Sequence, residues 1–169
     1  MYRWWGSSDT AAMRVYLGSD HAGFELKKYL IEKLAERGDE PVDIGPTVLD
    51  PEDDYPPFCL HTAYRVAGDP GSLGIVIGGS GNGEQIAANK VPGVRAALAW
   101  SEVTARLARQ HNDANIVALG ARMHSADEAW KITLAFLDTP FSGEPRHRRR
   151  IDQVMAYERE HTLPPLPST

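Results

Sequence analysis

The sequence predicts an α/β fold: a doubly wound, five-stranded parallel sheet in three layers, within a single domain that ends in a C-terminal helix. Three observations predict this fold. Short apolar runs alternate with helical patterns of about 10–15 residues, which is typical of βαβ units. The length of 169 residues fits one domain with a sizeable core. The sequence contains no internal repeat.

The expected strands are short apolar runs, most of which end in glycine. In chain order they cover residues 13–18, 40–45, 73–78, 93–100 and 115–120. The expected helices carry an apolar stripe, as in the first, where Phe24, Leu30 and Leu34 lie on one side and Gly38 provides a stop. In chain order they cover residues 21–38, 57–68, 83–91, 101–112, 125–139 and 144–161.

Two flanking segments do not fit this pattern. Residues 1–12 place two adjacent tryptophans in a polar segment, which we interpret as a flexible extension of the domain at 13–161. Residues 162–169, TLPPLPST, are proline-rich and polar, so we expect a disordered tail rather than a polyproline ligand.

Composition excludes several classes of protein. The net charge of −5 disfavours non-specific nucleic-acid binding, and no apolar run approaches the roughly 20 residues of a membrane span. The N-terminus lacks the apolar core of a signal peptide. A single cysteine, Cys59, excludes an internal disulfide framework and a multi-cysteine zinc site. We therefore expect a soluble cytoplasmic protein with no role at membranes.

The most unusual stretch is a glycine-rich loop between the third strand and the next helix, IVIGGSGNGEQIAANK. A nucleotide P-loop would place Lys after its last glycine, and here Glu84 follows Gly83. A dinucleotide fingerprint would need a third glycine that the loop lacks. The remaining candidate ligand is an anion formed during a reaction, with backbone N–H groups of residues 79–83 as donors and Glu84 as the base.

Glu84 also has an ordinary structural explanation. Asn82 and Gln85 have the spacing of a capping box, which would leave Glu84 in the first helical turn, where a negative charge suits the helix dipole. Other polar residues near strand ends have similar explanations: Asp20 fits a helix cap, His21 a surface histidine and Arg122 a solvated cation. In a doubly wound sheet, however, the carboxyl ends of the strands are where ligands bind.

The run RHRRRIDQ, residues 146–153, is basic in an otherwise acidic chain. A solvated helix face and a nucleic-acid patch are two interpretations. A third is a site for one small anionic group, because arginine forks match the geometry of a phosphate.

Read together, GSDHAGFELK, the DDYP loop, the glycine loop, ARQHNDANIVALGAR and PRHRRRID resemble the type B ribose-5-phosphate isomerases in order and spacing, from Met13 to Glu160. The resemblance implies a Rossmann-like or flavodoxin-like fold. It further implies a homodimer whose active sites draw on both subunits, and cofactor-free, metal-free interconversion of an aldose phosphate and a ketose phosphate.

The resemblance also implies roles for particular residues. Asp20 and His21 lie near the substrate, Tyr55 lines the pocket, and His111 with Asn112 opens the furanose ring. The enediolate is held by the loop residues Gly79, Ser80, Gly81, Asn82 and Gly83. The phosphate is bound by Arg122, Arg146, His147 and Arg150.

One departure from the family pattern concerns the base. Many members have a catalytic cysteine at the position of Gly78, whereas Cys59 lies in an earlier helix and does not match. In the subgroup typical of actinobacteria the proposed base is a glutamate at the position of Glu84. Two other functions stay open on the sequence: isomerisation of allose 6-phosphate, another hexose phosphate or a free rare sugar, and non-catalytic sugar-phosphate binding.

Overall fold

Five parallel strands form one sheet in a computed structural model that describes residues 11–168. The strands are β1 (Arg14–Ser19), β2 (Glu40–Gly45), β3 (Leu73–Gly78), β4 (Ala96–Leu98) and β5 (Ile116–Gly120). The helices are a short 3-10 turn, η1 (His21–Gly23), and α1 (Phe24–Arg37), α2 (Tyr55–Ala67), α3 (Asn82–Ala88), α4 (Glu102–Asn112), α5 (Ala126–Leu137) and α6 (Pro145–Glu160). The predicted fold class is confirmed.

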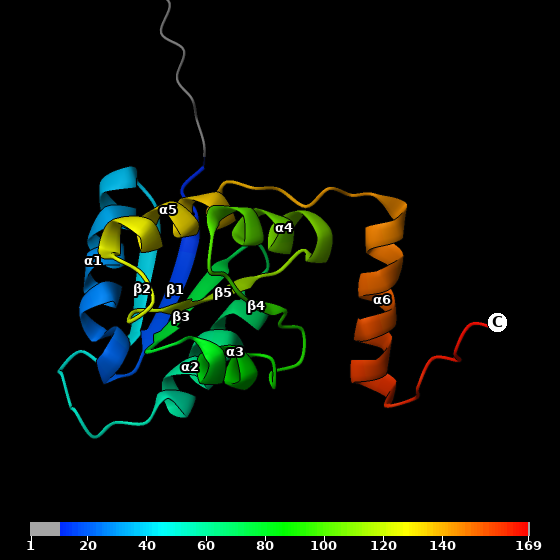
Figure 1. The fold of residues 1–169 in the computed structure, drawn as a ribbon, viewed down its shortest axis with the longest axis horizontal. Coiled ribbons are helices and arrows are strands. Elements are labelled where there is room, and N and C mark those ends of the chain that lie inside the picture. The colour runs from blue at the N-terminus through cyan, green and yellow to red at the C-terminus, as the bar shows by residue number, and fades with distance from the viewer. Residues whose placement is uncertain (1–10, 169) are drawn as a thin grey trace, which may run out of the picture.

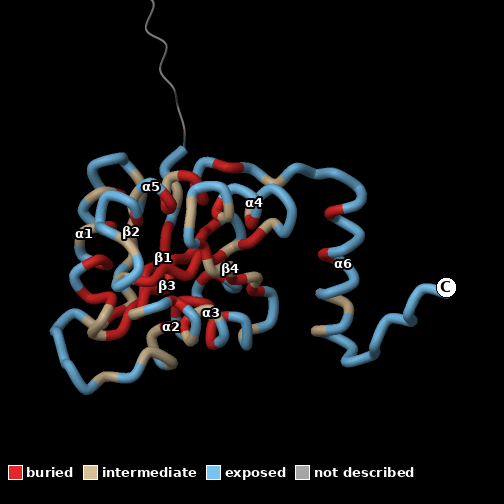
Figure 2. Tube along the Cα trace, viewed as in Figure 1, coloured by how far each residue is buried: buried red, intermediate tan, exposed pale blue. Residues whose placement is uncertain are grey.

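Alternation along each strand produces the three layers (Figure 1). Ile75 and Ile77 point to the face covered by α1, α4 and α5, while Val76 points to the face covered by α2 and α3. All three side chains are buried, because a parallel sheet has helices on both faces. The buried residues gather on the central strands and the inner sides of these helices (Figure 2).

The strand order β2-β1-β3-β5-β4 places a topological switch point between β1 and β3. After β1 the chain turns outward to β2, and it then returns to form β3 on the other side of β1. The loops that leave β1 and β3 therefore diverge at the carboxyl edge of the sheet. In open α/β sheets this divergence opens a crevice for ligands.

Helix boundaries follow the local signals closely, with one exception. Ser101 and Ser125 close capping boxes on α4 and α5, and Gly38 ends α1 in the left-handed conformation. The capping box expected at Asn82 and Gln85 is wrong: Asn82 is the first residue of α3, and Gly81 precedes it with φ +85°. A Cβ at Gly81 would lie 2.7 Å from the Leu98 side chain. Both the positive φ and the lack of space for a side chain therefore favour glycine at this position.

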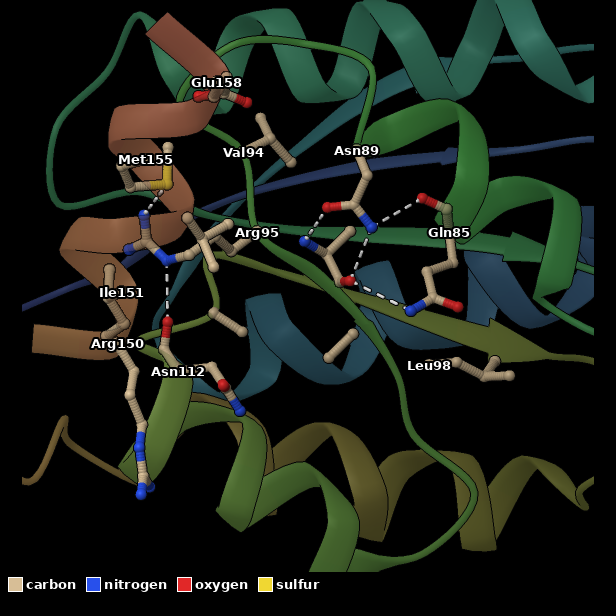
Figure 3. Close-up of a pocket in the computed structure, with 14 residues that line it drawn as sticks. Gln85, Asn89, Val94, Arg95, Leu98, Asn112, Arg150, Ile151, Met155 and Glu158 are labelled. Atoms are coloured by element: carbon tan, nitrogen blue, oxygen red, sulfur yellow. Dashed lines mark hydrogen bonds between the residues drawn. The ribbon is translucent and has the colours of Figure 1, made fainter. Parts of the chain in front are cut away.

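The expected strand at 93–100 is shorter in the structure, because only Ala96–Leu98 pairs with β5. β4 lies at the edge of the sheet, and the backbone of Ala96 faces outward. Asn89 bonds this backbone on both sides: its Oδ1 accepts from Ala96 N–H at 2.8 Å, and its Nδ2 donates to Ala96 O at 2.9 Å (Figure 3). The side chain thus replaces a neighbouring strand.

Helix α6 stands apart from the three layers (Figure 1). Of its 16 residues only His147 and Ile151 are buried. The tail 162–168 is exposed and forms no helix or strand, and its disorder stays a prediction. The extension expected at 1–12 lies mostly outside the described residues. Within 11–168 no helix has the length and apolar character needed to cross a membrane.

Asn89→Ala should destabilise the fold by about 1–2 kcal/mol, because two partly buried hydrogen bonds to the edge strand are lost and each contributes roughly 0.5–1.5 kcal/mol. Urea unfolding of the variant and the wild type measures the difference. Lys90→Ala, at the exposed neighbouring position, is the matched control. Equal unfolding midpoints for Asn89→Ala and the wild type would show that water replaces these bonds without cost.

Candidate active site

The carboxylate of Glu84 lies against the backbone of Gly78, at the carboxyl end of β3. A Cβ built on Gly78 would lie 1.7 Å from Glu84 Oε1, so any side chain at position 78 would occupy the space of the carboxylate. Glu84 is 4% exposed, although it belongs to the first turn of α3. The glycine at the end of the strand therefore creates the cavity that the glutamate fills.

Two further acidic groups, Asp20 and Cys59, lie close to Glu84. Burial raises the pKa of Glu84 above its ordinary value, and the charge of Asp20 raises it further, while backbone N–H groups of Glu84 and Gly81 act in the opposite direction. Burial, together with Glu84 and Asp20, strongly raises the pKa of the Cys59 thiol. The thiol is thus kept protonated, while the pKa of Glu84 moves toward neutral pH.

Asp20 also shapes the turn after β1. Its Oδ1 accepts from Gly23 N–H at 3.2 Å, which caps η1 as expected for this residue. Its own N–H donates to Ile77 O at 3.3 Å, which ties the turn to β3. A Cβ at Gly23 would lie 2.6 Å from that same carbonyl oxygen, so the turn approaches β3 as closely as a backbone can.

His21 has a carboxylate partner that sequence reasoning did not select, Asp53. Asp53 Oδ1 accepts from the His21 backbone N–H at 2.8 Å and lies 2.8 Å from His21 Nδ1. The hydrogen bond that the Asp53 carboxylate accepts raises the pKa of His21, and the charge of Asp20 adds to the effect while desolvation opposes it. Asp53 belongs to the acidic loop before Tyr55. It is separated from His21 by 32 positions in the sequence, so no local pattern indicated the pairing.

The glycine loop and the residues packed on it lie at the same edge. Ser80 Oγ accepts from the backbone N–H and the side-chain Nδ2 of Asn82 at 3.3 and 3.1 Å. Tyr55 packs over Gly83, where a Cβ would lie 2.5 Å from the phenol ring. Arg122 N–H donates to Gly79 O at 3.1 Å, and its guanidinium covers Gly79. One cation therefore lies beside the loop.

The remaining expected residues lie at the opposite edge of the sheet. Helix α4 follows β4 and returns to the start of β5, and its 11 residues span about 16 Å. Asn112, its last residue, accepts from Arg95 Nε at 2.8 Å, just before β4 begins. His111 packs on His147 of α6 with ring centroids 4.2 Å apart. Within one chain, His111 and the basic residues of α6 thus lie far from Glu84.

The structure therefore assembles the expected residues into two groups. The first group, at the carboxyl edge, consists of Asp20, His21, Tyr55, Gly79, Ser80, Gly81, Asn82, Gly83, Glu84 and Arg122. The second group, at the amino edge, consists of His111, Asn112, Arg146, His147 and Arg150. Within residues 11–168, no three His, Cys, Asp or Glu side chains are grouped so that they could share a metal ion.

Comparisons with known proteins link the chain to one family. A family model described as Ribose/Galactose Isomerase matches residues 15–154. Ribose-5-phosphate isomerase B of Mycolicibacterium paratuberculosis is 60% identical over 155 residues, which are 92% of this chain and 98% of that protein. The crystal structure of ribose-5-phosphate isomerase B from Mycoplasma genitalium with bound ribulose-5-phosphate is 45% identical, with a TM-score of 0.84 over 88% of this chain and 97% of that one. A type B ribose 5-phosphate isomerase from Trypanosoma cruzi is 44% identical, with a TM-score of 0.85 over 90% and 100% of the two chains.

The raised pKa of Glu84 predicts a pH-dependent stability. The folded state binds the Glu84 proton more tightly than the unfolded chain, so the free energy of unfolding contributed by this group falls as pH rises from 4.5 through the raised value. Glu84→Gln cannot ionise and should not show this fall. Urea unfolding of both proteins at several values between about pH 4 and pH 8 measures the difference. Parallel stability curves would contradict the shift.

Proposed function

The chain belongs to the ribose/galactose isomerase family, and from this premise we propose that it interconverts ribose 5-phosphate and ribulose 5-phosphate through a cis-enediol, with Glu84 as the base. It is an aldose–ketose isomerase. The observation that carries the assignment of the base is the buried carboxylate of Glu84 in the space left by Gly78. This carboxylate lies at the switch point of the sheet, where the sugar would bind.

Glu84 takes the proton from C2 of the open-chain aldose and returns it to C1. The C2–H electron pair forms the C1–C2 double bond of the enediolate, and the negative charge moves to O1. The O2 proton then passes to O1, and the C2=O2 carbonyl forms as C1 takes the proton from Glu84. Since the reactant and the product are isomers, no external oxidant or reductant enters. Burial and the charge of Asp20 raise the pKa of Glu84, which brings the base nearer to the operating pH and strengthens it.

Backbone N–H groups of residues 79–83, with Ser80 and Asn82, are the donors that we assign to the enediolate. Arg122 covers Gly79 and is the cation of this chain that we assign to the phosphate. Asp20, His21 and Tyr55 line the same edge of the sheet, where they can bind the sugar hydroxyl groups. The Asp53 partner keeps the proton of His21 on Nδ1 and leaves Nε2 for the substrate.

We assign furanose ring opening to His111 and phosphate binding to Arg146 and Arg150, and we propose that a second copy of the chain supplies them. The length of α4 separates these residues from Glu84 of the same chain. A two-fold homodimer would bring the amino edge of one subunit to the carboxyl edge of the other and complete two identical sites.

Two surfaces could receive the second copy. A groove of about 560 Å³ lies between α6 and the β4 edge, lined by apolar residues such as Val94 and Ile151 and by polar ones such as Asn112 and Arg150 (Figure 3). On and just before α4, Trp100 and Val103 are 65% and 60% exposed. Apolar side chains gathered in this way are typical of a protein–protein interface. A cytoplasmic location stays a prediction.

Turnover of ribose 5-phosphate by the wild type and by Glu84→Gln tests the reaction and the base together. We expect the variant to lose at least about a hundredfold in kcat, because the amide cannot take the proton. Gly78→Ala, which keeps Glu84 but fills the space of its carboxylate, should lose activity as well. A wild type inactive on ribose 5-phosphate but active on a hexose phosphate or a free sugar would change the substrate. An active Glu84→Gln would remove this mechanism.

Co-expression of two inactive variants tests the shared site. In a hybrid of Glu84→Gln and His111→Asn, one site carries both substitutions and the other carries neither. Random pairing makes about half of the dimers hybrids with one of two sites intact, so about a quarter of wild-type ribose 5-phosphate turnover should return. Separate tags on the two variants isolate the hybrid. A site confined to one chain would give an inactive hybrid.

A further inference from the structure

The basic run at the start of α6 contains one side chain that is not exposed. His147 is 4% exposed, whereas Arg146, Arg148, Arg149 and Arg150 are all exposed. Assembly with a second copy would bury His147 further and cannot uncover it. Its surroundings therefore differ from those of the arginines that flank it in the sequence.

The ring of His147 packs on the ring of His111. Their centroids are 4.2 Å apart and their planes are inclined by 32°. The rings are thus in direct contact with tilted planes, slightly closer than the roughly 4.5–7 Å that is usual for aromatic pairs. His111 is exposed and belongs to the last turn of α4, where an unsupported side chain would sample several rotamers. The contact with His147 limits these rotamers.

Ser142 orients His147 in turn. Its Oγ lies 2.7 Å from His147 Nδ1 and accepts from Glu144 N–H at 3.1 Å, so its hydroxyl hydrogen is free to point at Nδ1. A neutral His147 with its proton on Nε2 satisfies this bond. Burial, followed by the neighbouring His111, lowers the pKa of His147, and Arg146 and Arg150 act in the same direction while Glu144 opposes it. The neutral ring, whose Nδ1 can accept this bond, is thus favoured.

The segment between α5 and α6 is itself tied to α4. Ser142 N–H donates to Gln110 O at 3.1 Å, and Arg109 Nε donates to Thr139 O at 3.2 Å. The guanidinium of Arg148 lies 4.6 Å from the centroid of the Phe141 ring. Ser142, His147 and His111 are therefore fixed relative to one another and to α4. A site that receives the end of α4 also receives the other two residues.

We propose that His147 is a positioning residue for His111, and that Ser142 fixes the orientation of His147, so that ring opening depends on both residues. This inference rests on the proposed function, in which His111 opens the furanose ring. It differs from the resemblance, which implied that His147 binds the phosphate. The His147 ring is buried, with one face on His111 and Nδ1 bonded to Ser142. These contacts suit a residue that orients His111 rather than one that contacts a charged ligand.

The two roles of His147 predict different kinetics, because the two substrates differ in form. Ribose 5-phosphate is mainly a closed furanose and must be opened on the enzyme. Ribulose 5-phosphate carries its phosphate on O5, the oxygen that would close its ring, so it reaches the enzyme as an open chain. The overall equilibrium fixes the ratio of kcat/KM in the two directions, so a variant lowers both by the same factor. Exchange of the C1 hydrogen of ribulose 5-phosphate with solvent passes through the enediol but needs no ring. A residue needed only for ring opening therefore leaves this exchange intact, whereas a phosphate ligand affects it.

The experiment measures kcat and KM in both directions, exchange of the C1 hydrogen of ribulose 5-phosphate in deuterated water, and inhibition by inorganic phosphate, for the wild type, His147→Asn and Ser142→Ala. We expect kcat/KM for ribose 5-phosphate to fall on the order of 10–100-fold in His147→Asn, the range for a small misplacement of a catalytic group. Ser142→Ala should show a smaller loss of the same kind. The rate of C1 exchange and inhibition by phosphate should stay at wild-type values.

His161→Asn is the matched control. It makes the same substitution at the C-cap of the same helix, at an exposed residue whose positive φ of 55° suits asparagine, and it should leave both directions unchanged. A raised KM in both directions, together with weaker inhibition by phosphate, would assign His147 to the phosphate and overturn the inference. Wild-type kinetics in both variants would overturn it as well.

Ser142→Ala keeps the test decisive if His147→Asn does not fold, because the exposed serine can be truncated without opening a cavity. A matching loss of C1 exchange in that variant would overturn the inference. A wild type inactive in both directions would instead refute the proposed function, which separates the two failures.

Discussion

The parallel direction of all five strands is the constraint on which the other features depend. Each strand must be followed by a segment that crosses back to the same edge before the next strand can begin. Loops at the carboxyl edge are thereby free to carry polar side chains, and the switch point between β1 and β3 brings the turn of Asp20 next to Glu84. The same requirement takes the end of α4, with His111, to the other edge.

At the carboxyl edge, shape and charge are closely linked. The missing side chain of Gly78 gives the Glu84 carboxylate a buried position that it could not otherwise occupy. Burial and the nearby Asp20 then raise the pKa of that carboxylate, which costs stability at neutral pH and makes a better base. The trade between stability and function is typical of active sites, where pKa values are moved toward the pH at which the group must work.

The amino edge is organised differently, by aromatic and apolar contact rather than by a buried charge. Helix α6 buries only His147 and Ile151, whereas Val154 and Tyr157 stay 62% and 44% exposed. A helix in a globular protein usually buries a continuous stripe, so α6 looks incomplete in one chain. Its first turn is nevertheless held firmly, through the stacked histidines and the ties between Ser142 and α4. The firmly held end is the end that carries the proposed site residues.

The sequence by itself determined the order and type of the elements, because the period of apolar residues and the caps at Ser101 and Ser125 act between near neighbours in the chain. It also drew attention to Glu84, through a glycine loop that no nucleotide motif explains. Only the tertiary structure decided that Asp53 pairs with His21 and that the Glu84 carboxylate occupies the space beside Gly78. It also decided that His111 lies away from Glu84. Contacts of this kind join residues far apart in the chain, so they depend on strand order and helix packing, which local patterns do not encode.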